Sequence, residues 1–417
     1  MHRHSHRLLV FFILCGFSLS IFSQPLPTAT PESVGLSSER LSRINHFVKD
    51  YVDTGQIAGM SSMVARRGKL VHFETYGKMN LETGKAMEKD AIFRIYSMTK
   101  PITSVAIMML YEEGHFQLDS PVSEFIPAFK GAMVYSEDTP DGKKAEEPNR
   151  EMTVQDLLRH TSGLTYGFFG NTPVDSMYRA AKVMRTDKTL ADMSEKLGTL
   201  PLLHHPGEVW HYGVSTDVLG HLVEVVSGQS LDVFFKERIF DPLKMHDTGF
   251  FVPEKDISRF VTNYQIGEDG ALTVADAPAT SRYTKPPTFL SGGGGLVSTI
   301  SDYMRFAQMF LNKGELDGVR LLGRKTVEYM RINHLKDDGE FAPGYGFGLG
   351  FAVMTDAVRA RVTGSEGTHN WGGLANTYFF IDPQEEIVGI LFAQFFPSNY
   401  YPIRRKFSVA IYQSIID

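Results

Sequence analysis

The sequence of 417 residues contains a single cysteine, Cys15. It lies in an apolar N-terminal stretch that we expect to be removed, so the mature chain would contain none. Disulfide bonds, a catalytic thiolate and cysteine-based metal sites are therefore excluded. Cys15 also lacks the small residues that precede a lipid-modified cysteine, so we do not predict a lipoprotein.

Long basic runs are missing as well. The chain has 42 lysines and arginines against 48 acidic residues, and loss of Arg3 and Arg7 with the N-terminal stretch would leave 40 against 48. Nucleic acid is therefore not an expected partner. His204, His205 and His211 lack the i, i+4 spacing or the in-register carboxylate of a metal site. We therefore predict neither a metal nor another cofactor.

Residues 1–23 have the order of a secretory signal peptide. His2 to Arg7 are basic, Leu8 to Phe17 are apolar, and Ser18 to Ser23 are small and mixed. The apolar run is shorter than the roughly 20 residues of a comfortable membrane span. We expect cleavage near Ser23–Gln24, export to the periplasm or the medium, and no stable membrane insertion afterwards. An uncleaved anchor is the alternative, and residues 24–30 are read as a lead-in.

The remaining chain has an ordinary globular composition, 42% hydrophobic and 22% charged, and is long enough for a sizeable core. Met60 to Tyr76 predicts two strands split by a turn, and Met152 to Phe240 is mainly helical in pattern. The tail is strand-like again and ends in a helix. Strands at both ends with helices between them predict an α/β (α+β) fold, with one sheet built from both termini and an inserted helical lobe. The expected tail elements are strands at Gly348–Val353, Thr377–Ile381 and Ile387–Phe392, and a helix at Arg404–Ile416.

Ser97 and Lys100 form an S-x-x-K pair, a short motif that combines a nucleophile with a base. Residues i and i+3 of a helix share a face, so the amine can reach the hydroxyl. The apolar run Ile102 to Tyr111 supplies that helix, and Gly114 is a plausible end. A capping serine beside a solvated lysine is the alternative for an isolated motif of this kind.

Such a pair needs a second proton shuttle and a backbone site for the oxyanion. Tyr212 is the candidate shuttle, and a candidate strand edge lies at Trp371–Leu374. With these residues the chain resembles the serine β-lactamase/penicillin-binding-protein-like superfamily, in the branch of class C β-lactamases and their esterase relatives. The resemblance covers about Pro31 to Ile411. Its ordered blocks are Phe93–Lys100, Leu118–Val122, Leu157–Leu164, Pro206–Glu208 with Tyr212, Ile239–Met245 with Asp247–Thr248, Gly292–Leu296 and Trp371–Gly373.

The resemblance implies a single catalytic domain with the β-lactamase/transpeptidase-like fold over residues 31–415. The sheet lobe would comprise about 31–115 and 285–415, and the helical lobe about 116–284. Ser97 would be the nucleophile, Lys100 the general base and Tyr212 the proton shuttle. The backbone amides of Ser97 and Leu374 would bind the oxyanion. An ordinary lysine is protonated near neutral pH, so burial and neighbouring charges must favour its neutral form, and the sequence leaves open whether Lys100 or Tyr212 is the base.

Two departures from the family pattern bear on the substrate. Val214 stands where the β-lactamases have the asparagine of Tyr-x-Asn. Trp371-Gly372-Gly373 stands where they have Lys-Thr-Gly, and loss of that lysine favours a less charged, more apolar acyl group. The Trp-Gly-Gly form resembles the family's carboxylesterases and transesterases. We therefore predict an esterase, with a β-lactamase or a D-stereospecific peptidase or amidase as the first alternative and a non-catalytic binding member as the second.

Several further residues are predicted near the site. Trp371, Gly372, Gly373, Val214 and Tyr96 are expected to contact a small-molecule acyl substrate. Tyr166, Phe168 and Phe169 either wall an acyl pocket or belong to the packing. We expect His160 to be a buried hydrogen-bonding residue, and His369 to line the site entrance or to face solvent. The glycine run Gly292–Gly295 lacks the lysine of a phosphate loop and predicts a close backbone approach.

Overall fold

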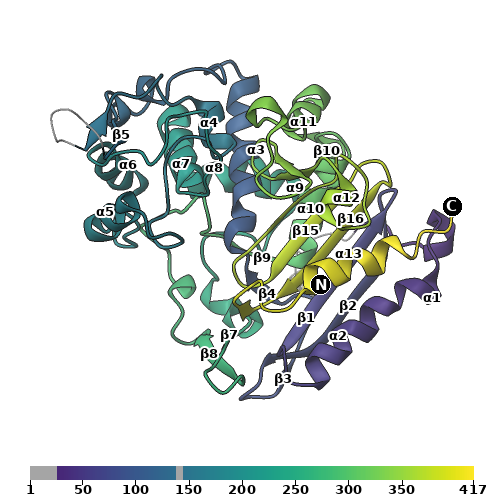
Figure 1. Ribbon diagram of the computed structural model, residues 1–417. Coiled ribbons are helices and arrows are strands. Elements are labelled where there is room, and N and C mark those ends of the chain that lie inside the picture. The colour runs from purple at the N-terminus through teal and green to yellow at the C-terminus, as the bar shows by residue number, and fades with distance from the viewer. Residues whose placement is uncertain (1–25, 138–143) are drawn as a thin grey trace, which may run out of the picture.

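A computed structural model describes residues 26–137 and 144–417. The predicted signal peptide lies outside these described residues. Figure 1 shows a twisted sheet with helices on both faces and a helical lobe beside it. In the part of the chain that the structure describes, no single helix is long and apolar enough to cross a membrane, although the bent pair Ser215–Ser227 and Leu231–Leu243 would be by length and composition.

The sheet joins the two ends of the chain, which confirms the predicted architecture. Its eight strands are all antiparallel, and strand β1 near the N-terminus pairs with β16 near the C-terminus, Met63 opposite Ile390. Every residue of these two strands is buried, because layers of helices cover both faces. In spatial order the strands are β12 (Tyr345–Phe347), β13 (Ala352–Met354), β14 (His369–Gly372), β15 (Thr377–Asp382), β16 (Ile387–Ala393), β1 (Gly59–Arg66), β2 (Lys69–Asn80) and β3 (Lys85–Ala86).

One face of the sheet is covered by α1 (Ser38–Leu41), α2 (Arg43–Asp53) and α13 (Ile403–Tyr412). Ile44, Val48 and Tyr51 recur at the spacing of one helical face, so α2 turns an apolar stripe toward the sheet. There they pack with Ile403 and Phe407 of α13 in one hydrophobic cluster. The terminal helices thereby fix β1 and β16 against each other.

The other face carries α3 (Thr99–Glu112) and α10 (Ile300–Leu311), and beyond α3 lies the helical lobe. All residues from Thr99 to Leu110 are buried, because α3 packs against α7 and lies in the main hydrophobic core, which also includes Met63 and Phe379 of the sheet. Gly114, with φ of 81°, follows the end of α3 as expected. The lobe contains α4 (Val154–Leu158), α5 (Pro173–Ala181), α6 (Leu190–Gly198), α7 (Ser215–Ser227), α8 (Leu231–Phe235) and α9 (Asp241–Leu243).

Small sets of paired strands lie outside the eight-stranded sheet. Strand β4 (Ile92–Arg94), which leads to Ser97, pairs with β9 (Val297–Thr299) just after the glycine run. Residues 263–276 form β7 (Asn263–Ile266) and β8 (Leu272–Asp276), and β7 pairs with β17 (Phe395–Phe396) from the C-terminal part of the chain. Outside these, the structure has β5 (Val134–Tyr135), β6 (Ala145–Glu146), β10 (Glu315–Leu316), β11 (Val319–Arg320), α11 (Arg324–Met330) and α12 (Ala357–Ala360).

One strand prediction in the tail is wrong. Gly348–Val353 is not a single strand, because the chain reverses there between β12 and β13. Gly350 has a φ of 105°, a conformation that glycine adopts without strain and that turns the chain. The other predicted tail elements are confirmed as β15, β16 and α13.

Candidate active site

Ser97 lies on the 3₁₀ turn η2 (Tyr96–Met98), directly before α3, and Lys100 lies in the first turn of that helix. The Lys100 Nζ is 3.3 Å from the Ser97 Oγ, so the i, i+3 geometry brings them together. Lys100 is fully buried, whereas Ser97 is half-buried and lines a cavity of about 550 Å³. The nucleophile is thus accessible and its amine partner is shielded.

Tyr212 reaches the same serine from the helical lobe. Its hydroxyl donates to the Ser97 Oγ over 2.8 Å. The residue comes just before α7, and its ring is held among aromatic neighbours, with ring centroids 5.3 Å from Tyr166, 5.6 Å from Trp371 and 5.0 Å from His160. The structure therefore unites Ser97, Lys100 and Tyr212 in one hydrogen-bonded group.

Lys100 has two further partners that the motif does not predict. Its Nζ donates to the Tyr166 hydroxyl over 2.9 Å and to the backbone carbonyl of Gly293 over 2.6 Å. With Ser97 these make three hydrogen-bonding partners, so a neutral Lys100 amine can donate to Tyr166 and Gly293 while its lone pair faces the serine hydroxyl. Burial, with the neighbouring Tyr212 and Asp217, raises the pKa of Tyr166 well above its ordinary value of 10.0, so this hydroxyl stays neutral.

Asp217 on α7 fixes the glycine run that supplies the carbonyl. Its carboxylate accepts from the Gly293 amide over 3.0 Å and from the Ser291 hydroxyl over 2.5 Å. A Cβ on Gly293 would lie 2.5 Å from the Asp217 Oδ2, so only glycine allows this approach. The close backbone approach expected for the run is therefore found at Gly293. Burial raises the pKa of Asp217, although Lys100 and the bonds from Ser291 and Gly293 oppose the rise.

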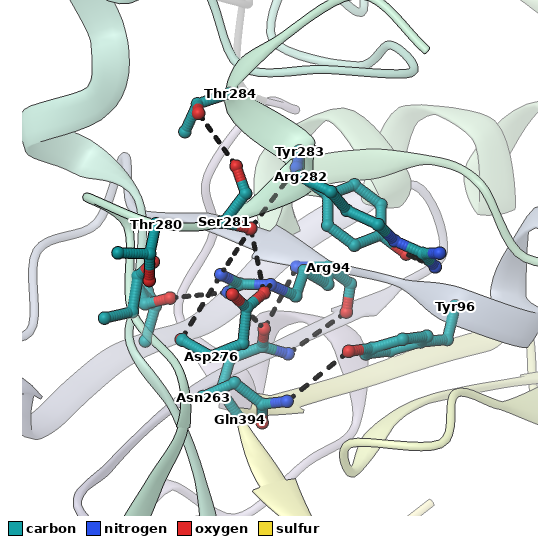
Figure 2. Close-up of polar contacts among 12 residues, drawn as sticks. Arg94, Tyr96, Asn263, Asp276, Thr280, Ser281, Arg282, Tyr283, Thr284 and Gln394 are labelled. Carbon is teal, nitrogen blue, oxygen red and sulfur yellow. Dashed lines mark hydrogen bonds and ion pairs between the residues drawn. The ribbon is translucent and has the colours of Figure 1, made fainter. Parts of the chain in front are cut away.

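The residue before the nucleophile is held in an unusual conformation. Tyr96 has a φ of 44°, which costs a non-glycine residue on the order of 1–3 kcal/mol. Its ring lies edge-on to Tyr283 and Phe396, and its hydroxyl accepts from Asn263 over 3.4 Å, as Figure 2 shows for the latter bond. These contacts hold Tyr96 in place at the cavity wall.

Arg94, two residues before Tyr96, anchors the same segment. It is fully buried, and its Nε donates to Asp276 over 2.6 Å while another nitrogen donates to the Ser281 hydroxyl over 3.1 Å (Figure 2). A third nitrogen donates to the carbonyl of Val261 over 2.7 Å. The strand that leads to Ser97 is thereby tied to residues 261–281.

Four of the five predicted substrate contacts line the cavity, namely Tyr96, Trp371, Gly372 and Gly373. Leu374, predicted for the oxyanion hole, lines it as well. Six of the other fifteen lining residues are aromatic, and those from the loop after the His-Thr-Ser-Gly block form one cluster with Tyr212. These aromatic lining residues are Tyr166, Phe168, Phe169, Trp210, Tyr212 and Phe289.

Two predicted positions differ in the structure. Val214 is fully buried and packs in the main hydrophobic core at the start of α7, so the substitution for asparagine adds packing rather than a cavity wall. His369 neither lines the entrance nor faces solvent. It is 1% exposed, and its ring packs against Phe310 and Phe351, because β14 alternates and this part of the strand faces α10. His160 is buried as expected, but its Nδ1 has no hydrogen-bond partner among the described residues.

Gly372 has a role that the sequence pattern does not reveal. The Arg404 guanidinium from α13 lies against it, so that a Cβ on Gly372 would be 2.4 Å from the Arg404 Nη1. The Arg404 Nη2 also donates to the Gly373 carbonyl over 2.6 Å. Asp217 and Arg404 are thus site residues that sequence reasoning did not assign, whereas it gives Tyr166 as a pocket wall or packing residue but not as a partner of Lys100. Only Tyr166 carried a signal, since it follows the His-Thr-Ser-Gly block.

Chemically, the arrangement is that of a nucleophilic hydroxyl with two proton-exchanging neighbours at the wall of an aromatic cavity. Within residues 26–137 and 144–417, no group of three His, Asp or Glu side chains is arranged to hold a metal ion. The contacts of the Ser97 hydroxyl with Lys100 and Tyr212 fit acyl transfer through a serine.

Comparison with known proteins agrees with this chemistry. Residues 44–413 match the family model described as Beta-lactamase. The chain is 34% identical over 364 residues to Protein Rv1367c of Mycobacterium tuberculosis, covering 84% of this chain and 89% of that protein. It is 29% identical over 345 residues to esterase EstB of Burkholderia gladioli, covering 78% and 83% of the two chains.

Solved structures agree with the fold. EstCE1, described as a hydrolase with promiscuous acyltransferase activity, superposes with a TM-score of 0.79 at 26% identity, covering 90% of this chain and 99% of its own. Unliganded simvastatin synthase LovD from Aspergillus terreus gives a TM-score of 0.77 at 24% identity, over 90% and 98% of the two chains. The predicted β-lactamase/transpeptidase-like fold is confirmed by these neighbours.

Proposed function

The chain belongs to the β-lactamase family, and from this premise we propose that it is an exported serine hydrolase that cleaves carboxylic esters through an acyl-Ser97 intermediate. The observation that carries the proposal is the pair of short contacts at one oxygen. The Ser97 Oγ is 2.8 Å from the Tyr212 hydroxyl and 3.3 Å from the Lys100 Nζ. A serine with two such partners can lose its proton as it attacks.

In the first half of the reaction, Ser97 Oγ forms a bond to the ester carbonyl carbon, and its proton passes to Lys100 as general base. Negative charge develops on the carbonyl oxygen, which the amides of Ser97 and Leu374 would bind. Leu374 is suited to this role because its amide donates to no other group among the described residues. The carbon–oxygen bond to the alcohol then breaks, and Tyr212 gives its proton to the leaving alkoxide and recovers one from Lys100.

In the second half, water attacks the acyl carbon and its proton follows the same path in reverse. The bond to Ser97 breaks, Ser97 regains its proton, and the carboxylic acid leaves. Tyr166 takes no part in proton transfer in this scheme, because its raised pKa keeps it a neutral hydroxyl that orients the Lys100 amine.

Ester preference is supported by the cavity wall and by the relatives. Trp371 replaces the family's lysine at the strand edge and contributes an indole within 5.6 Å of Tyr212. Aromatic walls of this kind bind apolar acyl groups. Relatives with comparable coverage include an esterase and a lovastatin esterase. A β-lactamase or D-stereospecific peptidase is the second candidate, since the relatives also include a putative D-alanyl-D-alanine carboxypeptidase.

Two measurements test the proposal. Mass spectrometry after reaction with a fluorophosphonate probe should find one adduct on Ser97, and a folded protein without this adduct would exclude serine catalysis. Turnover of a 4-nitrophenyl ester should then exceed that of a chromogenic cephalosporin. If only the cephalosporin is hydrolysed, the enzyme is a β-lactamase instead. Export is tested separately by N-terminal sequencing of the protein recovered from the periplasm or medium.

A further inference from the structure

The charge of the catalytic cavity has only one sign. Arg282 and Arg404 both line it, and among the described lining residues there is neither an aspartate nor a glutamate. The remaining lining side chains are aromatic, aliphatic or hydroxyl-bearing. A cationic group surrounded by such walls is poorly solvated and gains much from an anion placed beside it.

Arg404 is the more enclosed of the two arginines. Its guanidinium is pressed against Gly372 and donates to the Gly373 carbonyl over 2.6 Å, while its buried Nε has no hydrogen-bond partner among the residues that the structure describes. No carboxylate of the described residues lies within 4.0 Å of it. It also occupies the first turn of α13, where a cation opposes the helix dipole. Within the described residues, only the Gly373 carbonyl and the Tyr378 ring, 5.8 Å from the guanidinium carbon, offset part of the cost of placing this charge here.

Arg282 reaches the cavity from the segment that Arg94 anchors (Figure 2). The carboxylate in that segment, Asp276, is already engaged, because its Oδ2 accepts from Arg94 over 2.6 Å and from Ser281 over 2.8 Å. Arg282 itself lies over the Tyr283 ring at 5.1 Å and donates to the Tyr283 hydroxyl over 3.4 Å. It is exposed, so its guanidinium is free to meet a ligand.

We propose that Arg282 and Arg404 bind a carboxylate of the substrate, so that the preferred esters combine an apolar acyl or alcohol part with an acidic group. An arginine fork matches a carboxylate in two parallel hydrogen bonds, and such bonds are stronger in a poorly hydrated cavity. Loss of the family's lysine at position 371 therefore does not remove positive charge from the site. Arg404 of α13 and Arg282 supply positive charge instead, and Gly372 leaves space for the Arg404 guanidinium. This inference rests on the proposed esterase function.

The test compares esters that differ only in the acidic group. With the acid on the acyl side, mono-4-nitrophenyl glutarate is compared with 4-nitrophenyl butyrate. With the acid on the alcohol side, 4-butyryloxybenzoate is compared with phenyl butyrate. The measured quantity is the ratio of kcat/KM for the acidic ester to kcat/KM for the neutral ester, in the wild type, Arg282→Gln, Arg404→Gln and Arg404→Lys.

We expect the ratio to fall about tenfold or more in Arg404→Gln and in Arg282→Gln for at least one pair of esters, which also tells on which side the acid lies. Arg404→Lys should keep a larger share of the ratio than Arg404→Gln. Arg405→Gln is the matched control, because Arg405 is exposed on the same helical turn, bonds to the Ala360 carbonyl outside the cavity, and should leave the ratio unchanged.

The inference would be overturned if the ratio changed less than about twofold in both Arg282→Gln and Arg404→Gln. It would also be overturned if the ratio changed as much in Arg405→Gln as in those two variants. Failure of the proposed function looks different, since no ester would then be hydrolysed in a Ser97-dependent manner. If no ester is hydrolysed, the preference for an acidic group can still be measured without turnover. The measured quantities are then the rates at which Ser97 is labelled by two alkyl fluorophosphonates, one with and one without a terminal carboxylate. Equal effects of Arg404→Gln on both labelling rates would also overturn the inference.

Discussion

The hydroxyl of Tyr166 lies 2.9 Å from the Nζ of Lys100, in the interior of the protein behind the nucleophile. In the family's Tyr-x-Asn pattern a polar side chain is expected at position 214, but here Val214 packs in the core. Tyr166 supplies a polar contact to the lysine from a different element. Together with the Gly293 carbonyl, it fixes the direction in which the Lys100 amine points, and hence how it meets Ser97.

The first prediction removes this hydroxyl. In Tyr166→Phe the buried Lys100 amine loses one of its three hydrogen-bonding partners, and a hydrogen bond to such a group contributes about 1.5–3 kcal/mol. We expect kcat on a 4-nitrophenyl ester to fall roughly 10- to 100-fold, with little change in KM. Tyr178→Phe is the control, because Tyr178 is equally buried but its hydroxyl has no partner among the described residues. Equal losses in the two variants would mean that Tyr166 is merely structural.

The second prediction concerns the nucleophile and its base. Ser97→Ala and Lys100→Ala should each lower kcat by about 10³-fold or more, and the double variant should lose little beyond either single change, because the two residues act as a unit. Lys100 is fully buried, so Lys100→Met is added to preserve volume. Circular dichroism and thermal melting check the fold. Turnover near the wild-type value in either variant would contradict the acyl-enzyme mechanism.

Sequence reasoning located the parts of the site that are encoded locally. Ser97 and Lys100 are three residues apart on one helical turn, and Tyr212 lies in a block with a family pattern. The sheet was equally predictable, because β16 is a continuous apolar run and β1 contains the apolar stretch Met63-Val64-Ala65 just before a turn at Arg67-Gly68. Arg404 could not be found in this way. It is 31 residues from Gly373 along the chain, and only the packing of α13 across the sheet brings its guanidinium to the strand edge.

The third prediction concerns stability rather than chemistry. Asp276→Asn deprives the fully buried Arg94 of its charged partner, and breaking a buried pair from one side costs about 3–5 kcal/mol. Since the Asp276 side chain is 27% exposed, we expect the lower end of that range, about 3 kcal/mol in the free energy of unfolding. Asp187→Asn breaks the exposed pair with Arg185 and should leave the free energy of unfolding nearly unchanged, because such a pair is screened by solvent. Similar values in urea unfolding of the two variants would contradict this account.

The fourth prediction uses His160, whose ring packs between Tyr212 and Trp210 and is almost entirely buried. Burial, with the charge of Lys100 and the neighbouring His211, lowers the pKa of His160 well below its ordinary value of 6.5. In the unfolded chain the same ring takes up a proton near pH 6.5. Below that pH the unfolded state binds more protons than the folded state, so the free energy of unfolding must fall as the pH falls.

From this group we expect a loss approaching about 1.4 kcal/mol per pH unit below pH 6.5. His160→Asn lacks the titrating ring, and asparagine tolerates the φ of 56° found at this position. The variant should be less stable than the wild type near pH 8, and the difference should shrink steadily as urea unfolding is repeated toward pH 5. His72 and His369 titrate in the background of both proteins, since burial lowers the pKa of each to about 4. A difference that stays constant from pH 8 to pH 5 would show that His160 takes up its proton equally well in the folded protein.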